Sequence, residues 1–358
     1  MLEIITNNQR KYFGLEEINP DWKEMKIKSE NFNGFDVFIF VDKNIVRKCI
    51  LVGKTKYKEM QMKIELTKNL DGIISYGNEN KVSSLDSIIN KFGYGMTIYF
   101  DAPNINLFNE NTKKFYYKNY FDDSINVKTI EDFKAWVDAW CNESTEEDLS
   151  DITKFTKESK VHLKFNEGDV FRVKLTRRLY GYGRVLLNYI QMRKNNEKFW
   201  DCLMGTPIVA SLYHVVTTDK NLTVDDLKNL KSFPSEIILD NNVYYGEYEI
   251  IGNIPVDYEK EDYPIMYGRE LTAGKTTFFQ RGKKFLKLEN TEPLYTTFKY
   301  SGVSLNLGFK ISVMKKCIEE SSNLPYYENG PYFVRGDLRN PKNKEALAEV
   351  LKQFNLNG

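Results

Sequence analysis

The side chains best suited to hold another molecule stand in one short run, RRLYGY at 177–182, which contains Arg177, Arg178, Tyr180 and Tyr182. Guanidinium groups and tyrosine rings can stack on unpaired bases, as in proteins that bind single-stranded nucleic acid. The same residue types are enriched at the energetic centres of protein interfaces. Such a run can also be the solvated edge of a strand. These residues alone therefore leave a nucleic-acid partner, a protein partner and an ordinary strand edge open.

Two acidic side chains, Glu247 and Glu249, alternate in the segment YYGEYEIIG at 244–252. Paired carboxylates can act as acid and base or hold a cation. They can also form the charged outer face of a strand, or meet a basic partner and speed its association. We expect the charged outer face, with Tyr244 and Tyr245 on the same exposed rim as the basic run.

The glycine-rich segments predict turns and strands, with no nucleotide site. The run GRELTAGKT at 268–276 has one residue too many between its glycines for a phosphate loop, and a strand-like segment follows it. Gly181 and Gly183 lack the third glycine of a dinucleotide fingerprint, so they predict a bend or a bulge in a strand.

The histidines and cysteines predict no catalytic residue, no metal site and no cofactor. His214 lies in the apolar segment IVASLYHVVT, which favours a buried, hydrogen-bonded side chain, and His162 is far from it in the chain. The cysteines at 49, 141, 202 and 317 form no C-x-x-C pair, which favours buried reduced thiols over zinc.

Strands must position the basic and aromatic run. Apolar and charged residues alternate over 170–175, which is typical of a half-buried strand, and a second strand begins near Gly183. Further strands are predicted at 208–217, 237–239 and 244–251. A segment at 278–285 is expected to close this sheet. Thr223 and Asp226 predict a capping box ahead of a short helix.

The chain before this region is predicted to be rich in strands and then helical. Segments 35–40 and 45–52 predict a hairpin, and further strands are predicted at 57–66, 95–100 and 115–120. A short helix is predicted at 83–91. Thr129 and Asp132 predict the capping box of a helix whose tryptophans, Trp136 and Trp140, we interpret as core residues. Ser144 is predicted to cap a second helix that ends near residue 158.

These elements predict an α+β protein with four segments. Residues 1–128 form a β-rich domain, 129–160 a helical connector, and 161–289 a second antiparallel domain, a sheet or barrel-like structure with short helices. Residues 290–358 form an extension with a terminal helix at 342–354. Lys and Arg total 51 against 50 Asp and Glu, a balance that argues against a dedicated nucleic-acid binder. No apolar run is long enough to span a membrane, and no secretory leader is recognised, so a cytoplasmic location is expected.

Three segments together resemble the immunity protein 26 family. They are GDVFRVKL at 168–175, YGYGRVL at 180–186 and YYGEYEIIGNIPV at 244–256, and the resemblance spans roughly residues 164–289. It implies an immunity protein of a bacterial polymorphic toxin system, which binds and neutralises a cognate toxin without catalysis. Some descriptions of the family mention phosphotriesterase, so a hydrolase is one alternative. A nucleic-acid-associated defence component is the other.

If binding is the function, we predict that the partner contacts the exposed rim of the second domain. The predicted partner-binding residues are Arg177, Arg178, Tyr180, Tyr182, Tyr244, Tyr245 and Glu247. The family supplies no established catalytic residue to carry over.

Overall fold

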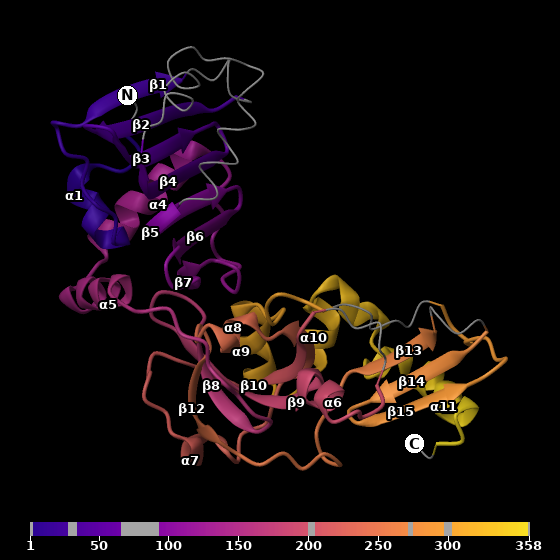
Figure 1. Cartoon of the computed structure of the whole chain (residues 1–358). Coiled ribbons are helices and arrows are strands. Elements are labelled where there is room, and N and C mark those ends of the chain that lie inside the picture. Colours follow the sequence, from indigo (N-terminus) through magenta and orange to yellow (C-terminus); the bar gives the residue numbers. More distant parts are fainter. Residues whose placement is uncertain are drawn as a thin grey trace. The chain divides into compact units, whose positions relative to one another are not determined.

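The protein is described from a computed structural model, in which residues 3–27, 34–65, 93–199, 205–270, 275–296 and 303–356 are placed (Figure 1). The chain forms two compact units. The first comprises Met1–Tyr120 and Ser124–Val161, and the second comprises Phe121–Asp123 and His162–Gly358. Helices and antiparallel sheets are both present and sheet predominates, so the predicted α+β class is confirmed. The borders predicted at residues 128, 160 and 289 stay predictions.

The first unit is built on a seven-stranded antiparallel sheet in which every strand pairs with its neighbours in sequence. The strands are β1 (Lys23–Ile27), β2 (Asp36–Asp42), β3 (Ile45–Val52), β4 (Lys56–Glu65), β5 (Gly93–Asp101), β6 (Asn104–Asn109) and β7 (Lys114–Lys118). The predicted hairpin is present as β2 and β3, and the strands predicted at 57–66, 95–100 and 115–120 are present as β4, β5 and β7. The helix predicted at 83–91 lies outside the described residues.

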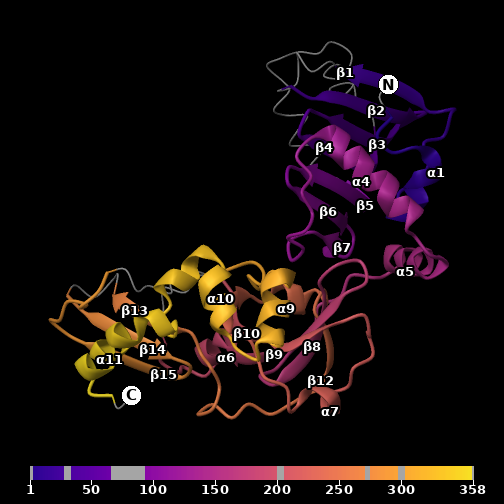
Figure 2. The same cartoon turned by 180° about the vertical axis from the view of Figure 1, so that it is seen from behind.

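Helix α4 (Ile130–Asn142) crosses one face of this sheet (Figure 2). Its predicted capping box is confirmed, because Asp132 N donates to Thr129 Oγ1 at 3.2 Å and Thr129 N donates to Asp132 Oδ2 at 3.0 Å. Phe133 is fully buried and stacks on Phe100 of β5, with the ring centroids 4.8 Å apart. Trp140 is also buried, which agrees with its interpretation as a core residue.

The second helix, α5 (Glu146–Thr156), begins one residue later than predicted. Its N-cap is Thr145, which forms a capping box with Asp148. Ser144 instead belongs to the end of α4, where its hydroxyl donates to the Trp140 carbonyl at 2.6 Å. Two hydroxyl residues stand side by side here, and each has an acidic residue three positions on, Glu147 for Ser144 and Asp148 for Thr145, so the capping-box pattern fits both starts. A short helix, α1 (Asn7–Arg10), and the 3-10 turn η1 (Lys11–Phe13) precede the sheet.

The second unit contains a five-stranded antiparallel sheet in the order β11-β10-β9-β8-β12. Its strands are β8 (Asp169–Lys174), β9 (Tyr180–Asn188), β10 (Pro207–Thr217), β11 (Glu236–Leu239) and β12 (Glu249–Asn253). Three short helices connect them: α6 (Tyr189–Lys194), α7 (Val224–Leu227) and α8 (Asn241–Tyr244). The predicted capping box of Thr223 and Asp226 precedes α7.

Two strand predictions in this unit are wrong. The segment at 278–285 does not close the five-stranded sheet, because β14 (Thr277–Arg281) turns back at Gly282 into β15 (Lys284–Leu288) and pairs with β13 (Ile265–Arg269) in a separate three-stranded sheet. The strand predicted from Tyr244 begins only at Glu249. Tyr244 instead ends α8, and Gly246, with a φ of 71°, turns the chain toward β12.

The last part of the chain folds onto these sheets as helices. They are α9 (Ile311–Glu319), α10 (Leu324–Asn329), the 3-10 turns η4 (Tyr332–Gly336) and η5 (Pro341–Asn343), and α11 (Lys344–Gln353). Helix α9 packs on β10, and α11 confirms the predicted terminal helix (Figure 2). Within the described ranges, no helix combines the length and apolar character needed to cross a bilayer.

One buried carboxylate on β11 ties this C-terminal part to the sheet. Glu236 accepts hydrogen bonds from the Tyr326 hydroxyl at 2.7 Å and from the Gly308 backbone N–H at 2.6 Å. Ser304 adds a parallel bridge to Ile238 at the outer edge of β11. Residues 303–326 therefore complete the edge of the five-stranded sheet.

Candidate partner-binding surface

The β8–β9 hairpin carries four of the seven predicted partner-binding residues, and β12 pairs with it through β8. Register places Arg172 opposite Tyr182 and Lys174 opposite Tyr180, so these four side chains share one face. Glu249 of β12 lies opposite Arg172 on the other side of β8. The alternation that predicted the first strand therefore also sorts its charged side chains onto one face.

Tyr182 is not on the exposed rim, and its predicted position there is wrong. Its side chain is fully buried in a cluster with Val170, Tyr213 and Leu227. The hydroxyl donates to the Asp219 carbonyl at 2.8 Å, and burial raises its pKa. The segment that follows β10 covers this face. A partner contact by Tyr182 itself stays a prediction that burial does not favour.

Tyr180 lies beside Arg172, which sequence reasoning did not include in the site. The Arg172 guanidinium stands 5.5 Å from the centroid of the Tyr180 ring, donates to the Lys220 carbonyl and pairs with Glu249. The Glu249 side chain is 59% exposed to solvent. Arg172 is thus a fixed bridge between an exposed carboxylate and an aromatic ring. The alternating pattern over β8 was the available signal for it.

The turn between β8 and β9 carries Arg177 and Arg178. Thr176 organises this turn, because its hydroxyl oxygen accepts from Arg178 N at 3.3 Å and from Leu179 N at 3.1 Å. A threonine hydroxyl that bonds backbone groups two and three residues ahead is a common turn device. Arg178 is exposed and Arg177 is half-buried. We call Arg172, Arg177, Arg178, Tyr180 and Glu249 the hairpin surface.

Tyr244 and Tyr245 form a second group with His162. The His162 ring stacks on Tyr244 at a centroid distance of 4.8 Å and an interplanar angle of 12°, and Tyr245 is 5.6 Å from the same ring. Leu163 N donates to the Tyr244 carbonyl at 2.8 Å, which holds the two segments together. We call these three residues the aromatic cluster. Glu247 follows it at a half-buried position before β12. No local pattern could reveal His162, because it is distant in sequence.

His214 makes the kind of hydrogen bond that its sequence context predicts. Its Nε2 lies 2.8 Å from Asn323 Oδ1 at the start of α10, and its ring is 4.4 Å from that of Phe233. Burial lowers the pKa of His214. Among the described residues, no group of three or more His, Cys, Asp or Glu side chains is arranged to hold a metal ion. The run at 268–276 joins β13 to β14, although residues 271–274 lie outside the described ranges.

Two fully buried carboxylates, Glu236 and Glu59, have pKa values shifted in opposite directions. Burial raises the pKa of Glu236 to about 7, against the opposing effect of its hydrogen bonds. In the first unit, burial alone would raise the pKa of Glu59, but Lys48 and Arg10 outweigh it and lower that pKa. Lys48 Nζ is 2.6 Å and Arg10 Nε 2.8 Å from Glu59 Oε1. Both carboxylates hold segments together, and neither lies at the surface.

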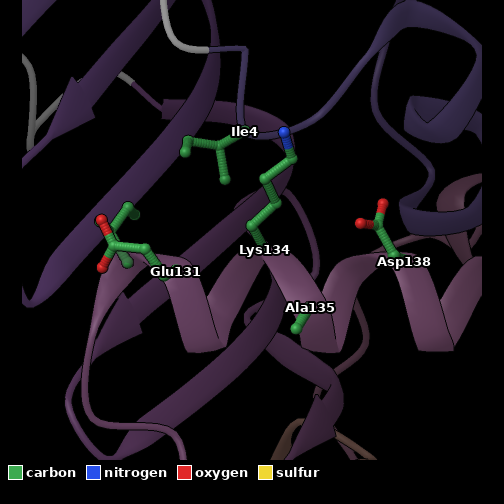
Figure 3. A pocket seen from close by; sticks show the side chains of 6 residues that line it. Ile4, Glu131, Lys134, Ala135 and Asp138 are labelled. Carbon is green, nitrogen blue, oxygen red and sulfur yellow. The ribbon is translucent and has the colours of Figure 1, made fainter.

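A hollow of about 310 Å³ lies over α4 in the first unit (Figure 3). Ile4 and Ala135 are among its lining residues, and Glu131, Lys134 and Asp138 rise from the same side of the helix. Lys134 stands between the two carboxylates, and Asp138 accepts from Gln9 Nε2 at 2.7 Å. Two carboxylates against one ammonium group leave one negative charge in excess in the lining.

Fold and surface together define an α+β protein that presents arginine and tyrosine side chains at the margin of an antiparallel sheet. Residues 166–277 match the family model described as immunity protein 26, which confirms the resemblance seen in the sequence. The matched segment runs from just before β8 to the start of β14 and includes all seven predicted partner-binding residues. Comparison with curated proteins and with solved structures gave no match.

Proposed function

We propose that this protein is an immunity protein that binds a cognate bacterial toxin in the cytoplasm and neutralises it by occupying a surface the toxin needs. The observation that carries the proposal is the match of residues 166–277 to immunity protein 26. Such a protein acts through shape and charge complementarity, with no bond made or broken.

We further propose that the toxin contacts the hairpin surface and the aromatic cluster. Arg178 and Glu249 are exposed, and the tyrosines of both groups are half-buried, so they combine rigid rings with accessible edges. Rings held by neighbours lose little conformational freedom on binding, which favours affinity. Exposed charges of both signs would orient an incoming partner and speed its association.

The direct test uses the open reading frames adjacent to the gene. Each is expressed in bacteria with and without this protein, and growth and complex formation are measured. We expect one neighbour to be toxic alone, to be tolerated when co-expressed, and to co-purify with this protein. If no neighbour is toxic, or if a toxic one is neither bound nor neutralised, the proposal fails.

Surface variants then test the location of the contact. Arg178→Glu and Tyr245→Ala should each weaken toxin binding by about tenfold or more, the effect expected of interface anchors. Lys228→Glu, a charge reversal at an exposed position immediately after α7, is the matched control and should leave affinity unchanged. Equal affinities for all three variants would place the contact elsewhere while leaving neutralisation itself intact.

A further inference from the structure

A second hollow of about 310 Å³ lies in the second unit, where three segments far apart in sequence meet. The chain between β12 and β13 supplies Tyr258 to Tyr263, the β14–β15 hairpin supplies Phe279 to Lys284, and the chain end supplies Leu351 and Leu356. Only the first of these segments lies inside the match to immunity protein 26. The hollow is therefore a joint product of the matched segment and the C-terminal residues.

Two buried aromatic residues form the base of this hollow. Phe279 is 1% exposed and Tyr263 is 2% exposed, so both rings are fixed by the core beneath them. The half-buried side chains of Leu351 and Leu356 complete the wall. A volume of this size is at the lower end of small-ligand pockets, and the exposed lining of this hollow, which carries Glu259, Arg281 and Lys284, is more polar than is usual for them.

Two cations at the rim repel each other. Arg281 and Lys284 are directly opposite residues of the β14–β15 hairpin, and both are exposed. Like charges in directly opposite positions destabilise a strand pair. In the part of the chain that the structure describes, neither side chain has an ion-pair partner. An anion placed between them would relieve the repulsion.

The other charges around the hollow are mostly engaged. Lys283 stands 4.0 Å from the centroid of the Tyr258 ring and 3.6 Å from Glu167 Oε2. Glu261 is held by Arg184. Glu259 is the remaining carboxylate in the lining, and it is exposed. Arg281 and Lys284 together carry one positive charge more than Glu259 neutralises. A ligand with a single negative charge, such as a carboxylate, therefore fits better than a doubly charged phosphate.

We propose that this pocket binds a carboxylate joined to an apolar group, with the charge between Arg281 and Lys284 and the apolar group against Leu351 and Leu356. The ligand can be a small free acid or an acidic residue of a polypeptide, because the chemistry recognised is the same. This inference goes beyond the proposed function and does not depend on a toxin being found.

The test is a set of NMR titrations of the full chain with matched probes. N-acetylphenylalanine carries both a carboxylate and an apolar ring. N-acetylphenylalanine amide keeps the ring but lacks the charge, and acetate keeps the charge but lacks the ring. We expect N-acetylphenylalanine to bind about tenfold more tightly than either, because the amide loses the charge-assisted contact and acetate loses the apolar contact of the ring. Arg281→Gln and Lys284→Gln should each abolish that preference, whereas Lys315→Gln, an exposed lysine on α9, should not.

A peptide with blocked ends that contains Asp-Phe distinguishes the two sources of the ligand. Tighter binding than N-acetylphenylalanine, lost in Arg281→Gln, assigns the pocket to a polypeptide partner, and weaker binding assigns it to small acids. The proposal is overturned if the acid and its amide bind equally, if nothing binds, or if Lys315→Gln removes binding as strongly as the two rim variants.

Discussion

The hydroxyl of Tyr326 donates to the carboxylate of Glu236 across 2.7 Å, and this contact joins α10 to the edge strand β11. Glu236 is fully buried, as is Tyr326. One partner lies inside the segment matched to immunity protein 26, and the other lies beyond it. The family-matched sheet and the C-terminal residues are thus joined through this buried carboxylate, which also accepts from the Gly308 N–H.

Glu236 should make stability depend on pH. Its pKa is raised from 4.5 to about 7 by burial, so the folded protein holds a proton that the unfolded chain has released. The contribution of Glu236 to the free energy of unfolding is therefore fully present below about pH 4.5 and is lost as the pH rises toward 7. The loss is roughly 3 kcal/mol at most. Urea unfolding at a series of pH values measures this slope. Glu236→Gln, which mimics the protonated acid, should flatten it, and an unchanged slope would contradict this assignment.

Tyr182 should behave as a core residue. Tyr182→Phe loses the hydrogen bond to the Asp219 carbonyl and should cost about 1 kcal/mol. Tyr182→Ala also opens a cavity and should cost about 3–5 kcal/mol. Chemical denaturation measures both changes in the free energy of unfolding. A Tyr182→Ala variant of normal stability with weakened toxin binding would instead restore the residue to the binding surface.

Glycine should be strictly required at position 183 and less strictly required at position 181. A Cβ on Gly183 would overlap the Ser211 carbonyl oxygen of β10 and lie 2.7 Å from Phe171 of β8. A Cβ on Gly181 would meet flexible side chains no closer than 3.3 Å. We expect Gly183→Ala to unfold at clearly lower temperature than Gly181→Ala, measured by circular dichroism. Similar melting of the two variants would show that the strands can separate to admit the methyl group.

Glu59 should be indispensable to the first unit. Glu59→Ala leaves Arg10 and Lys48 buried without their counter-charge, a change that costs about 3–5 kcal/mol. Glu131→Ala, on the exposed side of α4, is the control and should have little effect. Tryptophan fluorescence during urea unfolding suits this measurement, because Trp22, Trp136 and Trp140 lie in the first unit. Coincident unfolding curves for the two variants would rule out a stabilising role of the buried network.

Local patterns predicted the elements that depend on local chemistry. The alternation over β8 and the capping boxes at Thr129 and Thr223 follow from neighbours within a few residues, and both are present. The burial of Tyr182 depends on a segment about forty positions away, which no local pattern encodes. Gly246 in the sequence indicates that the chain turns after α8. The tyrosines before it favour strands, so the sequence predicted a strand where a single helical turn is present.

The site was predicted in part for the same reason. Arg178 is exposed as expected, since turn residues are placed by their own backbone. The partners that fix the other side chains, Arg172 against Tyr180 and His162 against Tyr244, arise from pairing across strands and between distant segments.

The bridge between Ser304 and β11 has a practical consequence for shortened forms of this protein. A chain that stops at residue 277 would leave the outer hydrogen-bonding row of β11 open to solvent and strip the cover from Glu236. An exposed edge strand has unpaired N–H and C=O groups that can pair with another chain. Such a truncated protein is expected to self-associate, so the boundaries of the family match are poor guides to a stable, monodisperse fragment.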